Sequence, residues 1–463
     1  MYHIKTIFGQ QTNIDLSHLD LKDHTPKILF EKINQKFDLY TSDYRLTNQT
    51  NAVISHESQV TPGNYFLVIG KRRLVYTLLD SETKLFVDSL NDLDRNHDRV
   101  KEMTIHRWGD HQYDRLNISR VVSQKITILA KDTPDLSNCR SLLGCFSGPL
   151  EIVGDLSDWN TSKVTDMSWM FSRNTVFNGD LSNFDTSNVT NMRGMFAENT
   201  AFNQPLSNFD TSNVTDMRGM FAENTTFNQD LSNFDTSKVT DMSGMFDGNT
   251  AFNQPLSNFD TSNVTNMREM FSSNTAFNQP LSNFDTSSVT NMSEMFSSNT
   301  VFNQDLSNFN TSKVTDMSWM FSHNNDFSRD LSNFDTSNVK TMSGMFYKNT
   351  AFNGDLSNFD TSKVTDMRGM FAENTAFNQP LSNFDTSNVT NMREMFSSNT
   401  VFNQDLSNFN TSKVTDMSWM FSHNTAFNRD LSNFDTSNVK TMSGIFYKNK
   451  AFNGDLSNFD TRL

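Results

Sequence analysis

The chain of 463 residues contains only two cysteines, Cys139 and Cys145, and only eight prolines. Two cysteines provide no disulfide framework. No run of the chain approaches the roughly 18 apolar residues of a transmembrane helix. The first residues, MYHIKTIFGQQTNIDL, also lack the basic, apolar and small-residue regions of a secretory signal. These absences predict a cytoplasmic chain without membrane insertion, with a cell-surface location reached by a non-standard route as the alternative.

Basic charge is scarce beyond the first third of the chain. Residues 1–150 carry 19 basic and 18 acidic residues, whereas the remainder carries 19 basic and 35 acidic ones. An acidic surface disfavours nucleic acid and anionic membrane, because both bind basic faces. The partners that remain are proteins and glycans.

Phenylalanine and methionine are abundant, and most of them lie in one stretch that recurs every 25 residues. It is best seen at residues 251–275, AFNQPLSNFDTSNVTNMREMFSSNT. Twelve complete copies fill residues 151–450 without insertion or deletion, and a thirteenth begins at Ala451. A fixed period of this length predicts a solenoid, in which each unit buries its apolar face against its neighbours. Positions within the repeat are numbered 1–25 from Ala251.

The apolar positions of the repeat predict its secondary structure. Positions 2, 9 and 21 hold 36 of the 42 phenylalanines, and positions 17 and 20 hold 23 of the 25 methionines, so these residues form a core rather than a metal site. Positions 14, 17, 20 and 21 share one face of a helix. With Ser at position 12 as N-cap and a left-handed Asn at position 24 as its end, a helix is predicted over positions 13–23.

Positions 5–9 are predicted to form a strand. Each repeat is then a strand, a polar corner and a short helix, and the stack is an α/β solenoid of leucine-rich-repeat type with a parallel sheet. Asn at positions 3, 8 and 24 recurs in most copies, and buried Asn side chains can satisfy backbone groups at the corners.

Residues 1–73 read as a small α+β domain. Strands, one helix and further strands are predicted, in order, at residues 2–8, 13–19, 26–37, 44–46 and 64–70. This order resembles a ubiquitin-like β-grasp domain, with residues 62–73 in the place of its last strand. The resemblance implies a docking module, since the chain continues beyond Arg73.

Residues 74–150 are predicted to bridge this domain and the array of residues 151–463. Strands are expected at residues 74–79, 84–90, 100–106 and 126–129. Residues 126–150 form a degenerate repeat that places both cysteines at core positions, where free Cys is common. His106 and His111 lie near Asp110 and Asp114, but a solvated polar loop explains them better than a metal site, and no metal or cofactor is predicted.

The run VTNMREMFSSNTAFNQPLSNFDTSNVT is similar to the repeats of BspA-like leucine-rich-repeat surface proteins, in the 25/26-residue form of mycoplasmas, lactobacilli and listeriae. The resemblance covers about two-thirds of the chain. It implies a leucine-rich-repeat-type solenoid with Met and Phe at Leu positions, and adhesion or partner binding rather than catalysis. The chain departs from that family in lacking a secretion signal, lipobox or cell-wall anchor, and in having an N-terminal domain.

The variable positions of the repeat are 18, 19, 22 and 23, on the predicted helix face that points away from the core. Large or charged side chains there are candidates for partner binding. The alternative is that these positions vary only because nothing constrains them. The candidates all occupy position 19: Trp169, Trp319, Trp419, Glu269, Glu294 and Glu394. Residues 301–360 and 401–460 are nearly the same sequence, so array length also acts as a spacer or sets valency.

No constellation of residues indicates catalysis. The only histidines of the array, His323 and His423, lie on the variable face, and there is no Gly-rich phosphate loop or nucleophile elbow. The chain is therefore predicted to be no enzyme but an interaction scaffold that binds protein or glycan. An exported adhesin and an ice- or mineral-binding solenoid are the alternatives. The apolar residues Phe452, Leu456 and Phe459, with no polar cap after them, predict either a tolerated exposed apolar face or end-to-end self-association.

Overall fold

The computed structural model describes residues 122–460 without interruption, residues 112–120 and Trp108, and, before these, only the strands given below. The chain divides into two compact units, Met1–Val189 and Thr190–Leu463. Each unit is described by itself.

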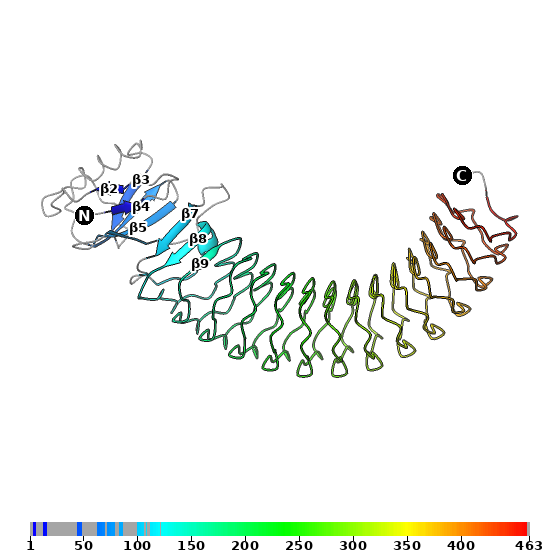
Figure 1. Ribbon diagram of the computed structural model, residues 1–463, viewed down its shortest axis with the longest axis horizontal. Coiled ribbons are helices and arrows are strands. Elements are labelled where there is room, and N and C mark those ends of the chain that lie inside the picture. Colours follow the sequence, from blue (N-terminus) through cyan, green and yellow to red (C-terminus); the bar gives the residue numbers. More distant parts are fainter. Residues whose placement is uncertain are drawn as a thin grey trace. The chain divides into compact units, whose positions relative to one another are not determined.

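The first unit opens with antiparallel strands. Strands β1 (His3–Lys5) and β2 (Asn13–Asp15) pair with each other. A four-stranded antiparallel sheet has the order β3 (Tyr44–Asn48), β4 (Gly63–Ile69), β5 (Arg72–Leu78) and β6 (Thr83–Phe86). Strands β2 to β5 are labelled in Figure 1, and these strands confirm the strands predicted in these segments.

The four-stranded sheet continues past the predicted domain boundary at residue 73. Val68 on β4 pairs with Arg73 on β5, so one hairpin spans the boundary. Among the described strands, none joins β4 to the β1–β2 hairpin, a pairing that a β-grasp sheet would contain. The predicted helix at residues 26–37 lies outside the described residues. The β-grasp interpretation and the division at residue 73 therefore stay predictions.

Strands β7 (Val100–Ile105), β8 (Val122–Ile128) and β9 (Glu151–Val153) form a parallel sheet in that order, with the short 3₁₀ helix η3 (Ile118–Arg120) before β8. Within the predicted degenerate repeat of residues 126–150, Ser141 forms a parallel bridge with Asp166, which occupies the same position of the next repeat. Cys139 and Cys145 are buried, and burial raises the pKa of each thiol. They are core residues, as predicted.

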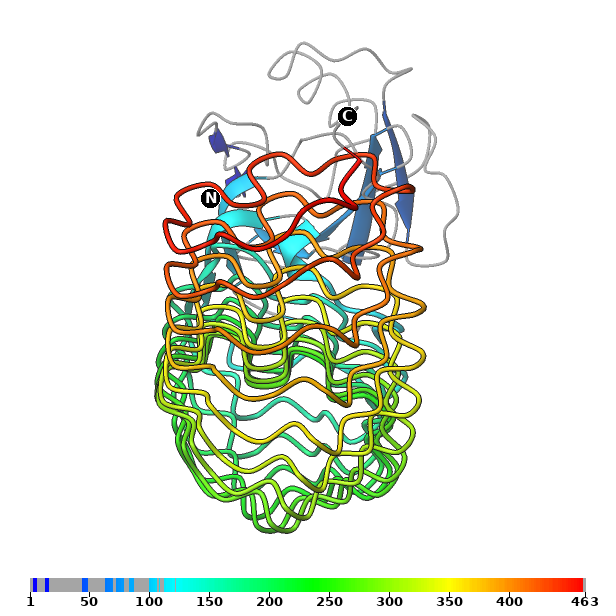
Figure 2. The same ribbon diagram turned by 90° about the vertical axis from the view of Figure 1, so that its right-hand side faces the viewer.

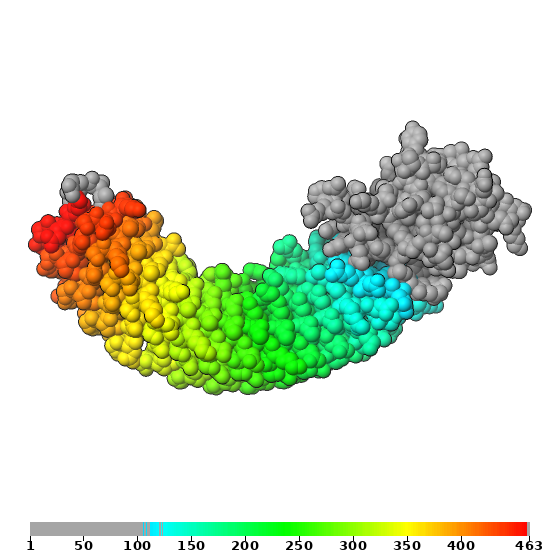
Figure 3. Space-filling view, turned by 180° about the vertical axis from the view of Figure 1, so that it is seen from behind, coloured from blue at the N-terminus to red at the C-terminus, as the bar shows by residue number. Residues whose placement is uncertain are grey.

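In the second unit each repeat forms one coil, and the coils stack side by side (Figure 1). Turned by 90°, successive coils of this unit lie over one another with a similar outline (Figure 2). The space-filling view shows a continuous surface, without gaps between neighbouring coils on the face shown (Figure 3).

The helix predicted over positions 13–23 is wrong, because the described coils contain consecutive turns and no helix. In the coil of residues 251–275, Val264 N–H donates to Thr261 O at 2.9 Å and Met270 N–H donates to Met267 O at 3.2 Å. Glu269 at position 19 and Ser273 at position 23 have φ of 57° and 53°. A right-handed helix cannot include such residues. Turns that each advance three residues produce the same apolar spacing that a helix would.

The strand predicted over positions 5–9 is also wrong. This segment contains a turn closed by Phe259 N–H and Leu256 O at 3.1 Å. Its carbonyls bind a side chain instead of a neighbouring strand, since Asn283 Nδ2 of the next coil donates to both Leu256 O and Phe259 O at 3.0 Å. Parallel bridges occur at position 16, for example from Asn266 to Asn291.

Backbone hydrogen bonds join neighbouring coils, mostly from one coil to the following one. The N–H of position 15 points the other way, and Thr265 N–H donates to Thr240 O of the preceding coil at 2.9 Å. The N–H groups of positions 17, 19, 21 and 23 donate to the carbonyls of positions 16, 18, 20 and 22 of the following coil. For one pair of coils, the donors and acceptors are Met267 to Asn291, Glu269 to Ser293, Phe271 to Met295 and Ser273 to Ser297, at 2.7–3.0 Å. Over positions 16–23 each coil therefore presents its N–H donors to the following coil and its carbonyl acceptors to the preceding one.

Phenylalanines at positions 2 and 21 stack through the core of the second unit. Phe271 lies 4.2 Å from Phe277 and 5.8 Å from the corresponding rings of both neighbouring coils, measured between ring centroids. Val, Met and Leu at the other apolar positions are fully buried along most of the unit. In the last repeat, Leu456 is 37% exposed, and the predicted end-to-end association stays a prediction.

Asn at position 24 is buried in every coil of residues 151–425, but it does not adopt the predicted left-handed conformation. The left-handed residue is the one before it, at position 23. Asn249 Oδ1 accepts the N–H of Phe252 at 3.1 Å, as the predicted corner role requires. The side-chain amide at position 24 has no such partner among the described residues in four of the coils. These residues are Asn274, Asn299, Asn324 and Asn374.

Candidate interaction face

The interaction face is the surface of the second unit formed by positions 18, 19, 22, 23 and 25. From Trp169 onward, every described residue at positions 19 and 23 has φ between 51° and 66°. Gly adopts this conformation freely, whereas other residues pay roughly 1–2 kcal/mol for it. Position 19 is Gly in about half of the coils and Trp or Glu in the others. The structure therefore holds these Trp and Glu side chains at an energetic cost.

The six predicted candidates share this left-handed backbone but lie in different surroundings. Trp169, in the first unit, is 36% exposed. The other five, including Trp319 and Trp419, are half-buried, although position 19 was predicted to lie on a face that points away from the core. Glu269 and Glu294 are brought together by Arg268, whose Nη2 lies 2.6 Å and 3.2 Å from their carboxylates. Trp319 and Trp419 lie four coils apart.

Trp319 packs across the next coil. Its indole covers Gly344, where a Cβ atom would overlap the ring. The indole meets Tyr347 edge to face at 5.4 Å between centroids, and the Arg368 guanidinium lies 5.8 Å from the indole centroid. Trp419 packs over Gly444 in the same way and meets Tyr447 at 5.6 Å.

Tyr347 connects this tryptophan to a set of polar side chains. The ring of Tyr347 lies 5.1 Å from that of His323, and the Lys348 ammonium lies 5.2 Å from its centroid. Its hydroxyl donates to Glu373 at 3.1 Å, and burial together with that bond raises the pKa of Tyr347. Burial and the Lys348 charge lower the pKa of His323, which favours the neutral imidazole.

The aromatic cluster, defined as Trp319, His323, Tyr347 and Lys348, has a second copy. Its members are Trp419, His423, Tyr447 and Lys448. Corresponding ring and cation distances in the two copies agree within 0.2 Å. The near-identical sequence blocks therefore reproduce the same local geometry on one face.

Carboxylates gather on the same face around Asp247. Burial raises the pKa of Asp247 to about 6, and repulsion from Glu269, Glu223 and Glu294 adds to this, although a hydrogen bond from Ser272 opposes it. Burial also raises the pKa of Glu294, against the effect of Arg268. Among the described residues, no three His, Cys, Asp or Glu side chains are placed to hold a metal ion.

The raised pKa of Asp247 predicts a pH-dependent stability. The folded chain holds this proton more tightly than the unfolded chain, whose carboxyl titrates near 3.8. The contribution of Asp247 is therefore fully present below about pH 4 and is lost as pH rises through about 6. We expect a loss on the order of 1 kcal/mol, reduced by the partial exposure of the side chain. Urea unfolding of the wild type and Asp247→Asn across pH 4–7 measures it.

The variant Asp285→Asn is the matched control. A hydrogen bond from Ser287 lowers the pKa of Asp285, so the stability from this residue is lost as pH falls below about 4. The stability change caused by Asp285→Asn therefore falls below about pH 4, outside the range of about pH 4–6 in which Asp247 acts. Equal pH dependence of the wild type and Asp247→Asn between pH 4 and 7 would contradict the prediction.

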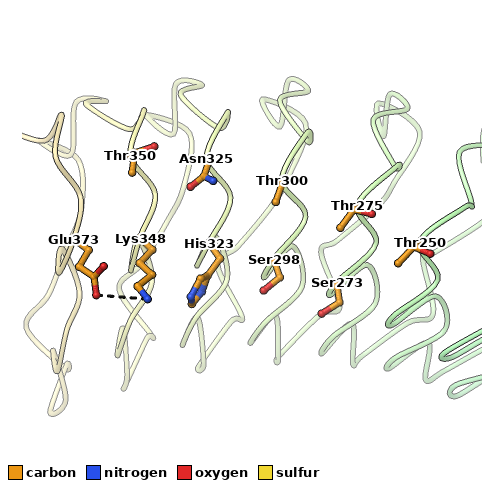
Figure 4. Close-up of a pocket in the computed structure, with 10 residues that line it drawn as sticks. All are labelled: Thr250, Ser273, Thr275, Ser298, Thr300, His323, Asn325, Lys348, Thr350 and Glu373. Atoms are coloured by element: carbon orange, nitrogen blue, oxygen red, sulfur yellow. Dashed lines mark ion pairs between the residues drawn. The ribbon is translucent and has the colours of Figure 1, made fainter. Parts of the chain in front are cut away.

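A groove of about 610 Å³ crosses six successive coils of the interaction face (Figure 4). One row of its lining comes from position 25: Thr250, Thr275, Thr300, Asn325 and Thr350. The other comes from position 23: Ser273, Ser298, His323, Lys348 and Glu373. Lys348 and Glu373 form an ion pair at 3.6 Å, drawn as a dashed line in Figure 4. Every lining side chain carries a hydrogen-bonding group.

Reasoning from the sequence missed several members of this face. Gly344, Tyr347 and Arg368 were not singled out, and position 25 was not considered variable. One signal was present: in the duplicated blocks, Trp at position 19 is followed one repeat later by Gly at position 19 and Tyr-Lys at positions 22 and 23. That pairing indicates contact between adjacent coils.

Comparison with known proteins identifies the repeats but not their role. A family model described as "Mycoplasma protein of unknown function, DUF285" matches residues 140–236, 223–330, 315–410 and 377–463. The four matches follow one another along the array. No curated protein and no solved structure matches the chain. The described part of the chain contains no helix with the length and apolar character needed to cross a membrane.

Proposed function

The chain belongs to the DUF285 family of Mycoplasma repeat proteins, whose function is unknown, and we propose that it is a non-catalytic interaction scaffold. In this proposal the repeat array binds protein or glycan through the interaction face, and the N-terminal region docks to a second partner. The observation that carries the proposal is the row of Trp and Glu side chains held in left-handed backbone at position 19.

Strain of this kind is a physical argument for function. Gly fits position 19 in other coils, for example Gly219 with φ of 57°, so the fold does not require a larger residue there. Backbone strain that the fold could avoid concentrates at binding sites. Tryptophan, tyrosine and arginine are also the residues that dominate binding energy at protein interfaces. The aromatic cluster and Arg368 supply all three.

The likeness of the repeats to BspA-like surface proteins supports an exported adhesin as the second candidate. An adhesin would carry the same face to a cell surface, whereas the scaffold proposal requires no export. Detection of the native protein in the medium or on intact cells would decide for the adhesin.

The proposal is tested with the full chain and the double variant Trp319→Gly and Trp419→Gly. Gly restores the residue found at position 19 in other coils, so the backbone is retained. We expect partners captured by the wild type and identified by mass spectrometry to be recovered at least tenfold less with the double variant, because a hot-spot residue contributes 2 kcal/mol or more, about thirtyfold in affinity.

Ser398→Gly is the control, since it removes a side chain from a left-handed position of a coil outside the two aromatic clusters. It should capture the same partners as the wild type. Unchanged recovery with the double variant would contradict a role of the aromatic clusters in binding.

A further inference from the structure

The groove of the interaction face contains hydroxyl groups that the fold does not use. Elsewhere in the coil, threonine hydroxyls join neighbouring coils: Thr261 donates to Asp285 O at 2.9 Å and Thr265 donates to Thr240 O at 3.2 Å. The hydroxyls of the groove residues Ser273, Ser298, Thr275 and Thr300 make no hydrogen bond to any described residue. These groups are therefore available to a ligand.

The backbone fixes the direction in which the Cα–Cβ bonds of the two serines leave the coil. Ser273 and Ser298 have φ of 53° and 55°, and their N–H groups bind carbonyls of the next coil at 2.7 Å. The threonines follow two residues later in the same coils. A ligand that binds such a preorganised row pays little entropy to order it.

The charges of the groove balance one another. Lys348 is paired with Glu373 at 3.6 Å, and the lowered pKa of His323 favours its neutral form. The other lining side chains are uncharged hydroxyl or amide groups. A polyanion would find no excess positive charge here, and the array as a whole is acidic.

The groove also differs from a site for an apolar peptide. Protein hot spots place aromatic or aliphatic anchors in desolvated pockets, and no aliphatic side chain such as Leu, Ile or Val lines this groove. The same pair of polar positions recurs once per coil, and in the core beneath them the position-21 phenylalanine rings of adjacent coils lie 5.8–5.9 Å apart. This spacing is comparable to the length of one sugar ring in a linear chain.

We propose that the groove binds a linear, uncharged glycan whose sugar units lie across successive coils and exchange hydrogen bonds with positions 23 and 25. The inference rests on the proposed function and names the partner of the same face. The glycan hydroxyls donate to and accept from Ser273, Ser298, Thr275 and Thr300, and Asn325 contributes an amide. His323 and the Lys348–Glu373 pair close one end of the row.

Affinity electrophoresis of the full chain tests the inference. The gels contain mixed-linkage β-glucan, galactomannan or dextran as neutral polysaccharides, and heparin as a charged one. The groove variant combines Ser273→Gly, Ser298→Gly, Thr275→Val and Thr300→Val. Gly suits the left-handed backbone of the two serines, so the variant retains the fold, which circular dichroism and the unfolding midpoint verify.

The control variant combines Ser398→Gly and Thr400→Val, the same two positions in a coil that does not line the groove. We expect at least one neutral polysaccharide to retard the wild type and the control equally. We expect the groove variant to bind that polysaccharide at least tenfold more weakly, because four hydrogen-bonding groups are lost.

Three results would overturn the inference: retardation by heparin alone, no retardation by any neutral polysaccharide, or equal retardation of the groove variant and the wild type. The scaffold proposal fails separately. If no polysaccharide binds but Trp319→Gly with Trp419→Gly still loses captured partners, the face binds protein and only the glycan inference is wrong. If the groove variant loses polysaccharide binding while Trp319→Gly with Trp419→Gly still captures the wild-type partners, the glycan inference stands and the role given to the tryptophans is wrong.

Discussion

Replacing Phe271 with alanine is expected to lower the free energy of unfolding by about 3–5 kcal/mol. The ring is fully buried and stacks on Phe277 at 4.2 Å and on Phe246 and Phe296 at 5.8 Å. Its removal leaves a cavity between three coils and breaks the row of position-21 phenylalanines at one point, while the position-2 row continues through Phe252, Phe277 and Phe302. Because coils gain stability only from their neighbours, the loss should appear in urea unfolding of the whole array.

Phe271→Leu is the control for this prediction. Leucine keeps most of the apolar volume and removes only the ring stacking, so we expect it to lose less than half as much stability as alanine. A loss below about 1 kcal/mol for Phe271→Ala would show that adjacent coils close over the missing ring and that the stacked rows are not the main source of stability.

Replacing Gly344 with alanine is expected to lower the free energy of unfolding by about 2–5 kcal/mol. About 1–2 kcal/mol comes from the left-handed φ of 61°. The rest, about 1–3 kcal/mol before relaxation, comes from the overlap between the new Cβ and the indole of Trp319, which must move. Urea unfolding measures the sum, and a change in tryptophan fluorescence reports the displaced indole.

Gly219→Ala separates the two contributions. Gly219 has φ of 57°, and the nearest atom to a Cβ placed there is Ala222 Cβ at an unstrained 3.7 Å. It should therefore show the backbone cost alone. In the combined variant Trp319→Gly and Gly344→Ala, the overlap is absent, so the cost of Gly344→Ala should fall to that of Gly219→Ala. Additive losses in the combined variant would contradict the packing of Trp319 over Gly344.

The sequence predicts the core of the array but not the path of its backbone. The phenylalanines, methionines, valine and leucine assigned to the core are buried, because a 25-residue period leaves few other ways to cover them. The path was mistaken because positions 14, 17, 20 and 21 fit a helix and a succession of turns equally well. Only the left-handed residues at positions 19 and 23, such as Glu269 and Ser273, distinguish the two. Glu, Trp and Ser rarely adopt left-handed φ values, so the sequence gives no sign of this conformation.

The candidate site was predicted only by position. Position 19 was identified because it varies. Its Trp and Glu side chains do reach the surface, where they are exposed or half-buried. The contacts around Trp319 depend on residues 25 and more further along the chain, including Gly344 and Tyr347. The spacing of side chains within one repeat cannot reveal contacts between repeats. The groove was missed for the same reason, since its two rows become adjacent only when coils stack.

The hydrogen bonds that positions 17, 19, 21 and 23 of each coil make to the following coil give the array a fixed period of 25 residues. Met267, Glu269, Phe271 and Ser273 find acceptors 24 residues further on, and each following coil repeats the offset. Loss or gain of one whole repeat leaves every donor facing an equivalent acceptor. Loss or gain of any other number of residues breaks this period for the coil that follows and leaves its apolar positions facing solvent. Gene-level duplication of whole repeats can therefore lengthen or shorten the array while every remaining contact is kept.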